Sequence, residues 1–295
     1  MHIMKLLAIS ATAAFAVVAN AQGVDWQRVD TQLGRTAVVS GDVHRYGFPR
    51  SDLQVTLDGV SLKPAFALGG WAAFKPMGNE VMVMGDLVLL GTEINPVMTK
   101  LLDGGLQITG IHNHLLRAEP ATFYMHVGGH GDPMKLAAAI HTALAESKTP
   151  LTVPTAGAPP PAIDLDTAQL DQIMRAKGQA NGGVYQVSVP RRDPITEKGM
   201  EISPPGPMGA ATAINFQPTG SGKAAITGDF VLIAEEVDPV VKALRMNGIE
   251  IAAIHIHMLT EQPRLIFLHF WANDDALKLA RGLSAALDKT ASKRN

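Results

Sequence analysis

An internal duplication constrains the fold of this chain more than any other feature of its sequence. Residues 85–147 align with residues 228–290 without a gap, at a constant offset of 143, and 22 of these 63 residue pairs are identical. Looser similarity continues upstream, where "FPRSD" in the first copy corresponds to "VPRRD" in the second. The chain therefore holds two copies of one module, and both copies are expected to share one fold.

A segment rich in proline and glycine, "TPLTVPTAGAPPPAIDLD", separates the two copies. Proline lacks a backbone N–H and fixes φ, so this segment cannot continue a helix and is expected to be a linker. We divide the chain into a signal segment (1–21), a first module (22–148), a linker (149–164) and a second module (165–295).

Each copy has the same order of predicted elements, which is strand, helix, strand, strand, helix. In the first copy the strands are "GDLVLL", "LQITGIHNHLL" and "TFYMHV". The first helix of each copy is expected to have Asn95 or Asp238 as its N-cap, followed by proline at the first helical position. It should end near Gly104 in one copy and Gly248 in the other.

The last helix of each copy is predicted from apolar residues at helical spacing in "DPMKLAAAIHTAL" and "DDALKLARGLSAAL". This order of elements predicts an α+β fold in which each module is an antiparallel sheet with helices on one face. A ferredoxin-like half is one fold that fits this order, and we expect the two modules to pack about a pseudo-twofold axis.

The first 21 residues have the pattern of a secretory signal. "MHIMK" supplies positive charge, "LLAISATAAFAVV" is apolar, and Ala19-Asn20-Ala21 matches a small-residue cleavage site. This apolar run is shorter than the roughly 20 residues that cross a bilayer. We expect cleavage after Ala21 and a soluble periplasmic or secreted protein. Because the chain has no cysteine, disulfides and thiolate metal ligands are excluded.

Charge and hydropathy exclude two further classes of function. The formal net charge is -2 and no basic groove signal is present, which argues against a nucleic-acid partner. No segment after the signal is long and apolar enough to be a membrane helix. The expected partner is a metal or a small molecule, and the sequence does not specify an oligomeric state.

Three histidines were kept in both copies of the duplication. The aligned pairs are His112 with His255, His114 with His257, and His126 with His269. The neighbouring His130 and His141 have no histidine counterpart, since they align with Asn273 and Ser284. About two-thirds of all aligned positions changed, so the three retained pairs are expected to be under a constraint that the other two histidines lack.

The predicted strands bring the retained histidines together. Residues i and i+2 share one face of a strand, so His112 and His114 point the same way. If the following turn centres on Glu119, His112 lies opposite His126, with Cβ atoms about 4.5–5.5 Å apart. The second copy should repeat this arrangement, with His255 opposite His269. This predicts one three-histidine metal site per module, for zinc first and otherwise for copper, nickel or iron.

Two retained glutamates are candidates for a catalytic role. Glu93 and Glu236 follow a strand end, from which they could reach a neighbouring strand end and orient or deprotonate a metal-bound water. A favourable charge near a helix N-terminus is the structural alternative. The remaining retained acids have local roles in this prediction: Asp132 and Asp275 as helix caps, Asp86 and Asp229 as turn or bulge residues.

The retained histidines also allow two interpretations without a metal. They could line a pocket for a small ligand, or they could be hydrogen-bonded residues of the core. His-x-His followed by glutamate also resembles the first metal motif of the cupins, although the helices between the strands do not fit the almost entirely β cupin fold.

Several longer strings resemble a known family. "GWAAFKPMGNEVMVMGDLVLL" and "ITGIHNHLL" in the first copy, with "ATAINFQPTG" and "FWANDDALKLARGL" in the second, are similar to the LppY/LpqO family of bacterial exported proteins. That family is known mainly as a domain of unknown function, so the resemblance implies export but no reaction. The family pattern has His-Asn-His in both halves, and this chain departs from it at Ile256.

These features predict an exported metal-binding protein, and two functions stay open. One is a metal-dependent hydrolase, in which Glu93 or Glu236 acts on the metal-bound water. The other is a non-catalytic periplasmic binding protein for a metal or a small anionic ligand. The polar residues Thr109, Asn113 and Tyr124 favour the first copy as the active one.

Overall fold

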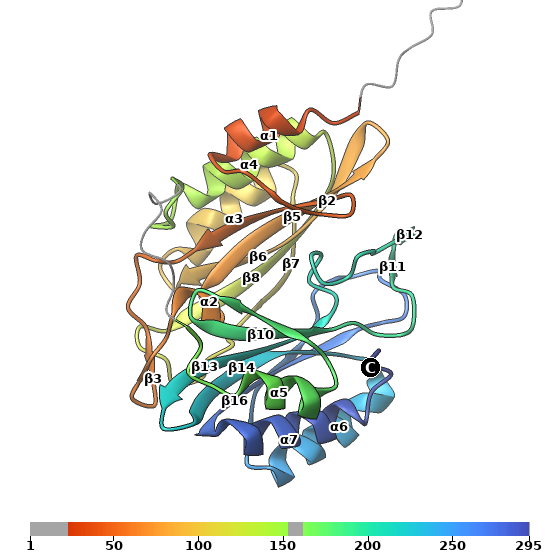
Figure 1. Cartoon of the computed structure of the whole chain (residues 1–295). Helices are drawn as coiled ribbons and strands as arrows, with labels where there is room; N and C mark the ends of the chain where they lie inside the picture. The colour runs from red at the N-terminus through yellow and green to blue at the C-terminus, as the bar shows by residue number, and fades with distance from the viewer. Residues whose placement is uncertain (1–22, 153–161, 295) are drawn as a thin grey trace, which may run out of the picture.

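The computed structural model describes residues 23–152 and 162–294. Each module contains a six-stranded antiparallel sheet with helices on one face (Figure 1), so the predicted α+β class and the duplicated architecture are confirmed. The predicted signal segment and the middle of the predicted linker lie outside the described residues. None of the helices in the described ranges has the length and apolarity needed to cross a membrane.

The first sheet has the strand order β1-β2-β5-β6-β8-β7. Its strands are β1 (Val38–Ser40), β2 (Val43–Pro49), β5 (Gly69–Met77), β6 (Glu80–Leu90), β7 (Gln107–His112) and β8 (Thr122–Gly131). The helices of this module are α1 (Trp26–Leu33), α2 (Pro64–Ala67), α3 (Ile94–Asp103) and α4 (Pro133–Leu144). A short hairpin is formed by β3 (Thr56–Leu57) and β4 (Val60–Ser61).

The second sheet has the order β15-β16-β14-β13-β10-β9 and repeats the first. Its strands are β9 (Gly178–Asn181), β10 (Val184–Val189), β13 (Thr212–Gly220), β14 (Lys223–Leu232), β15 (Glu250–His255) and β16 (Ile266–Asp275). The helices are α5 (Thr167–Met174), α6 (Ala234–Met246) and α7 (Ala276–Leu287). A second short hairpin is formed by β11 (Thr196–Glu197) and β12 (Met200–Glu201).

The two sheets face each other in the middle of the molecule, and the helices other than the short α2 cover the outside (Figure 1). The alternation along β6 accounts for this layering, because successive side chains of a strand point to opposite faces. Val81 and Val83 join the core under the helices of their own module, whereas Met82 and Met84 pack against residues of the other module. Both faces of each sheet are therefore buried, one within the module and one between modules.

Two apolar clusters of the inner layer contain residues of both modules. One of them includes Tyr124 of the first module and Trp271 of the second, and the other includes Met84 and Phe267. The modules thus share part of their core, and the site described below lies on this shared inner layer.

The first long helix of each copy begins earlier than predicted. α3 begins at Ile94 and α6 at Ala234, so Asn95 and Asp238 lie inside the helices and are not their N-caps. The reason in α6 is that the carboxylate of Glu236 accepts the backbone N–H of Ile233 at 3.0 Å, which satisfies a donor before the first turn.

The caps predicted for the last helix of each copy are confirmed. The side chain of Asp132 accepts the N–H of Lys135 at the start of α4, and Asp275 accepts the N–H of Lys278 at the start of α7. The predicted helix ends near Gly104 and Gly248 are also observed.

Candidate metal centre between the modules

All six retained histidines gather in one place between the two sheets. Four lie at or just beyond the ends of the edge strands β7 and β15, and two lie within β8 and β16. We call this group the histidine cluster, and its members are His112, His114, His126, His255, His257 and His269. The two predicted three-histidine sets therefore meet in a single cluster, and the predicted set of the second module, His255/His257/His269, is one of the groups there that could hold a metal.

The strand register differs from the predicted one. His126 lies opposite Gly110 and not opposite His112, whose cross-strand partner is Tyr124. The second module repeats this difference, since His269 lies opposite Ala253 and not opposite His255.

The pairings of Gly110 with His126 and of His112 with Tyr124 place the middle of the connection at Ala118, one residue before the predicted Glu119, and a β-bulge between Ile108 and Gly110 shifts the pairing further along the strand. Leu115 and its counterpart Met258 are buried in the shared inner layer, so the chain leaves the strand at His112 and at His255. His114 and His257 consequently lie outside the strands and reach toward the other module.

Ring-to-ring distances in the cluster obey a pseudo-twofold symmetry. His112 and His255 stack on each other with ring centroids 3.6 Å apart, so the axis passes between these two equivalent residues. His114 lies 3.6 Å from His269 across the modules, and the equivalent distance from His257 to His126 is 3.8 Å. The predicted pseudo-twofold arrangement is thus observed at the site itself. His112 and His114 form a possible ligand set with His269 of the other module, whereas His255 and His257 form one with His269 of their own module.

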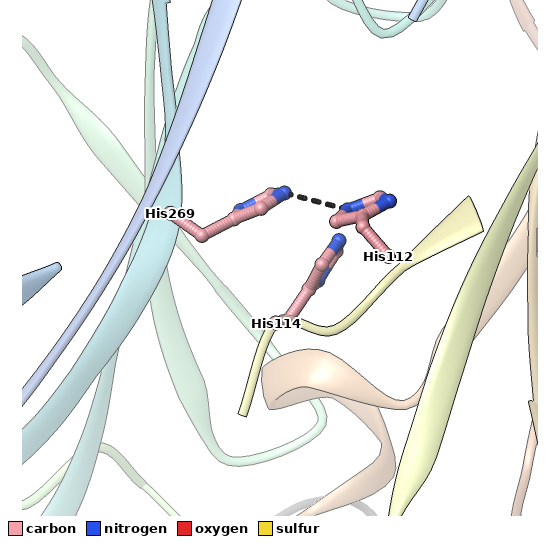
Figure 2. Close-up of side chains that lie close together, drawn as sticks. All are labelled: His112, His114 and His269. Carbon is pink, nitrogen blue, oxygen red and sulfur yellow. Dashed lines mark hydrogen bonds between the residues drawn. The ribbon is translucent and has the colours of Figure 1, made fainter. Parts of the chain in front are cut away.

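Figure 2 shows one such composite group, with His112 and His114 pointing toward His269. The Nε2 atoms of His112 and His269 are 3.1 Å apart. In four overlapping sets of three residues, the candidate ligand atoms all lie within 4.8 Å of one another. These sets are His112/His114/His269, His112/His126/His255, His255/His257/His269 and Asp86/His114/His126.

Many polar atoms of the cluster are buried without a hydrogen-bond partner among the described residues. Buried polar groups are normally paired, so such a concentration of unpaired atoms is unusual. The atoms are His112 Nδ1, His114 Nε2, His126 Nε2, both ring nitrogens of His255, His257 Nε2, Asp86 Oδ1 and Asp229 Oδ1. His257 Nε2 lies 3.3 Å from Asp229 Oδ2, but without the geometry of a hydrogen bond.

Burial keeps the six imidazoles uncharged at neutral pH. Desolvation, helped by neighbouring histidines, lowers the pKa of His112 to about 2 and that of His126 to about 3. Desolvation also lowers the pKa of His269 to about 4, although a backbone hydrogen bond at Gly228 opposes this shift. The pKa values of His114, His255 and His257 are lowered in the same direction by burial first and by neighbouring histidines second. Neutral imidazole is the form that ligates metals.

A backbone carbonyl fixes the tautomer of His269. Its Nδ1 donates to the carbonyl oxygen of Gly228 at 2.7 Å, so the lone pair is on Nε2, the atom that faces His112. Such a bond to the far ring nitrogen is the usual way in which metal-ligating histidines are oriented. Gly85 provides the equivalent backbone hydrogen bond to His126.

Asp86 and Asp229 are the acidic residues next to the cluster, although only a turn or bulge role was predicted for them from the sequence. Asp86 is the β6 partner of His126, and Asp229 is the β14 partner of His269. Burial raises the pKa of Asp86 to about 7 against the opposing charge of Arg45. Burial, followed by the charge of Asp86, raises the pKa of Asp229 well above its usual range. Their retention in both copies was the signal that could have identified them.

Glu93 and Glu236 are in ion pairs and not in the cluster. Glu93 Oε2 lies 2.7 Å from Arg50 Nη1, and its carboxylate also accepts the backbone N–H groups of Leu90 and Lys148. Glu236 pairs in the same way with Arg191. None of the candidate metal-binding sets among the described residues contains either glutamate. The structural alternative, a charge that organises a helix start, fits these contacts.

A cavity of about 620 Å³ opens beside the cluster, between the two sheets. His114, His257 and His269 line one part of it. We call it the central cavity, and the residues of its other walls that matter below are Arg45, Trp71, Lys177, Gln186, Asn215 and Thr227. A small molecule in this cavity would be in direct contact with the histidine cluster.

Comparisons with known proteins give a family but no activity. No curated protein matches the chain. A trimeric bacterial microcompartment shell protein, PduB, is 14% identical, with 87% of this chain and 91% of that chain covered and a TM-score of 0.21. The double-ringed trimeric shell protein MSM0271 from the RMM microcompartment is 10% identical, with coverages of 72% and 84% and a TM-score of 0.21. No conclusion about this chain follows from these similarities.

A family model described as Domain of Unknown Function (DUF1259) matches residues 27–146 and again residues 168–289, once in each module. This match supports membership of a domain family of unknown function, but it does not test the resemblance to the LppY/LpqO family. The chain therefore belongs to the DUF1259 family, and each of its two modules is one copy of the family domain.

Proposed function

We propose that this protein binds a divalent transition metal, with zinc as the expected ion, at the histidine cluster where the two modules meet. The observation that carries the proposal is the set of buried, unpaired ring nitrogens facing one another in the cluster. Burying polar groups without partners is costly. A metal ion would supply one partner for several of them at once.

The spacing of the ring nitrogens supports this proposal. Two nitrogens bound to a tetrahedral zinc ion at about 2.0–2.1 Å are roughly 3.3 Å apart. The distance between the Nε2 atoms of His112 and His269 is 3.1 Å. With His114 as a third ligand, this set has the composition of a three-histidine zinc site, whose fourth position is open to water or substrate.

Elemental analysis of protein purified without a His tag tests the proposal. The wild type should retain zinc after dialysis against metal-free buffer, and a His112→Ala/His114→Ala variant should lose it. His141→Ala is the matched control, because His141 is a half-buried histidine of α4 outside the cluster. If the wild type holds no metal under metal-replete conditions, the proposal is wrong.

A specific observation favours hydrolysis as a second candidate function. The central cavity reaches three histidines of the cluster, so a substrate could approach a metal-bound water from it. A bound divalent ion lowers the pKa of a water and thereby supplies a nucleophile at neutral pH. Asp86 and Asp229, which also line the cavity, are then the carboxyl groups close enough to position that water.

Ester, phosphoester and lactone substrates separate the hydrolase from the non-catalytic binder. A hydrolase should lose activity in EDTA and regain it with zinc, and an Asp86→Asn/Asp229→Asn variant should lose activity while retaining metal. Turnover that is insensitive to EDTA would contradict this second candidate.

We also infer that the protein acts outside the cytoplasm. The inference is supported by the signal pattern of residues 1–21 and by the resemblance to the LppY/LpqO family. N-terminal sequencing of the mature protein should begin at Gln22, and a mature protein that keeps Met1 would contradict the inference.

A further inference from the structure

The guanidinium of Arg45 lies at the wall of the central cavity. It stacks over the ring of Trp71 at 3.7 Å, and its Nη1 donates to the carbonyl oxygen of Pro207. Among the residues that the structure describes, no carboxylate forms an ion pair with it. Asp86 acts on it only through space, since it raises the pKa of Arg45 while burial lowers that pKa to about 10. Arg45 is therefore a protonated cation facing the cavity.

Two other buried arginines of the chain have carboxylate partners. Arg50 pairs with Glu93 and Asp52, and Arg191 pairs with Glu236 and Asp193. A buried or partly buried charge without a partner is costly, and a planar guanidinium is suited to binding carboxylates and phosphates through two bonds. The exception at Arg45 thus points to an anion supplied from outside the chain.

The remaining walls of the central cavity carry donors and acceptors for hydroxyl groups. Gln186 donates to Asn215 Oδ1 and to the carbonyl oxygen of Ala65, each at 3.0 Å, and its own Oε1 accepts from Asn181, so it holds the amide of Asn215 in place at the wall. The hydroxyl of Thr227 is buried and has no partner among the described residues. Lys177 adds a second, exposed cation to the lining. The volume of about 620 Å³ lies within the range of roughly 300–1,000 Å³ that is typical of small-molecule sites.

We propose that the central cavity binds one small hydroxylated carboxylate, with its anionic group on Arg45 and its hydroxyl groups along the wall formed by Gln186, Asn215 and Thr227. The opposite end of the molecule faces the histidine cluster. Only this last contact rests on the proposed metal function, because the anion site uses none of the cluster residues.

The duplication predicts the stoichiometry. In the loosely aligned upstream region, where Arg50 corresponds to Arg191, the counterpart of Arg45 is Gln186. The second module therefore has an amide where the first has a cation. One chain should bind one carboxylate and not two.

Isothermal titration calorimetry with D-gluconate tests the proposal, with sorbitol as its uncharged counterpart and inorganic phosphate as an anion without a hydroxylated chain. The titrations use the full-length mature protein, once treated with EDTA and once loaded with zinc. Gluconate should bind with a stoichiometry of one, and sorbitol should not bind. Arg45→Gln should weaken gluconate binding about tenfold or more, as expected for the loss of a charged hydrogen-bonding partner.

Three controls accompany the titrations. Arg45→Lys keeps the charge and should bind more tightly than Arg45→Gln, and Arg28→Gln changes an exposed arginine of α1 and should bind like the wild type. Melting temperatures of all variants establish that they are folded. Metal content is measured on the same samples, so a missing metal centre is recognised separately from a missing anion site.

Each outcome decides one part of the proposal. Loss of binding in a folded Arg45→Gln variant, in EDTA-treated protein, supports the anion site even if the chain holds no metal. Equal affinity of the wild type and Arg45→Gln for gluconate overturns it. Failure of gluconate to bind, or phosphate binding as tightly as gluconate, overturns the assignment to a hydroxylated carboxylate.

Discussion

At the scale of single residues, the two arginine–glutamate pairs matter most for stability. Arg50 is fully buried, so the carboxylate of Glu93 is what makes its charge tolerable. Replacement of one partner in a buried ion pair leaves the other charge uncompensated. Glu93→Gln should therefore lower the free energy of unfolding by about 3 kcal/mol. Urea denaturation measures this loss, and Glu235→Gln, at an exposed position in the first turn of α6, is the control.

The same variant separates the structural role of Glu93 from the catalytic role predicted from sequence. Metal content per folded molecule should be unchanged in Glu93→Gln, because its contacts are Arg50 and backbone N–H groups and not histidines. A folded variant that loses its metal would contradict the structural role.

The lowered pKa of Glu93 implies that the stability of the protein depends on pH. Burial by itself would raise the pKa of Glu93, but hydrogen bonds from Arg50, Leu90 and Lys148 outweigh it and hold the pKa below the usual 4.5. The unfolded chain therefore binds the proton more readily, so stability is present above pH 4.5 and is lost as the pH falls through the lower folded-state pKa. The stability difference between wild type and Glu93→Gln should shrink on acidification. A difference that grows below pH 4.5 would contradict this sign.

Comparison of the two copies identified the six histidines but misjudged the acidic residues. All retained acids carried the same signal, and local patterns assigned Glu93 to catalysis and Asp86 to a turn. What decides their roles is the partner that each meets in space, an arginine 43 residues away for Glu93 and a cross-strand histidine for Asp86. The spacing of residues along the chain does not predict which partners they meet.

At the scale of elements, Gly228 and its counterpart Gly85 are retained in both copies because the neighbouring strand comes very close to their backbone. A Cβ atom on Gly228 would lie 2.0 Å from the carbonyl oxygen of Ala213 in the neighbouring strand β13. The carbonyl of Gly228 is also the acceptor that orients His269. Strand β14 therefore requires glycine at this position for packing and for the site.

Gly228→Ala should lower the free energy of unfolding by about 1–3 kcal/mol, as overpacking does. The substitution should also displace the carbonyl that accepts from His269. Loss of the hydrogen bond that orients a ligating histidine typically lowers metal affinity, so zinc affinity should fall by roughly 10–100-fold. Chemical denaturation and competition with a zinc chelator measure the two effects. Gly47→Ala is the control, since a Cβ there meets no atom within 4 Å, and it should change neither quantity.

Element order and helix ends were predictable because periodicity and capping are local properties. The helix starts at Asn95 and Asp238 were wrong because a glutamate two residues earlier already organises each helix start. Glu93 is the N-cap of α3, and the carboxylate of Glu236 accepts the backbone N–H of Ile233 at the start of α6. The strand register was wrong because the connection between β7 and β8 is centred on Ala118 and not on Glu119. The strands also end earlier than predicted, since the segment after each His-x-His pair buries Leu115 or Met258 between the modules. Burial between the modules is a tertiary effect, and it cannot be predicted from the alternation of residues within one strand.

At the scale of the whole molecule, the shared inner layer predicts cooperative unfolding. Trp271 of the second module packs against Phe66 of the first, and its Nε1 donates to Asp58 at 2.9 Å. Separation of the modules would expose both mixed clusters to water. Differential scanning calorimetry of the metal-free protein should show one transition whose calorimetric and van't Hoff enthalpies agree. Two resolved transitions would show that the modules unfold independently.

The way in which the two modules pack together could not be predicted from the sequence. The duplication predicts that both copies have equal sheets and equal histidines, but it carries no information on which faces meet. The composite sets, such as His114 with His269, arise only from that docking.

The stacking of His112 on His255 across the pseudo-twofold axis has a consequence for how a ligand can sit. Two identical modules around such an axis would offer every ligand two equivalent orientations, and half of the bound molecules would present the wrong end to any given group. Fusion in one chain allows the halves to differ, and here they differ at Arg45 and Gln186, at Asn113 and Ile256, and at Tyr124 and Phe267. An asymmetric ligand in this chain would therefore enter one way round and present the same bond to the histidines each time.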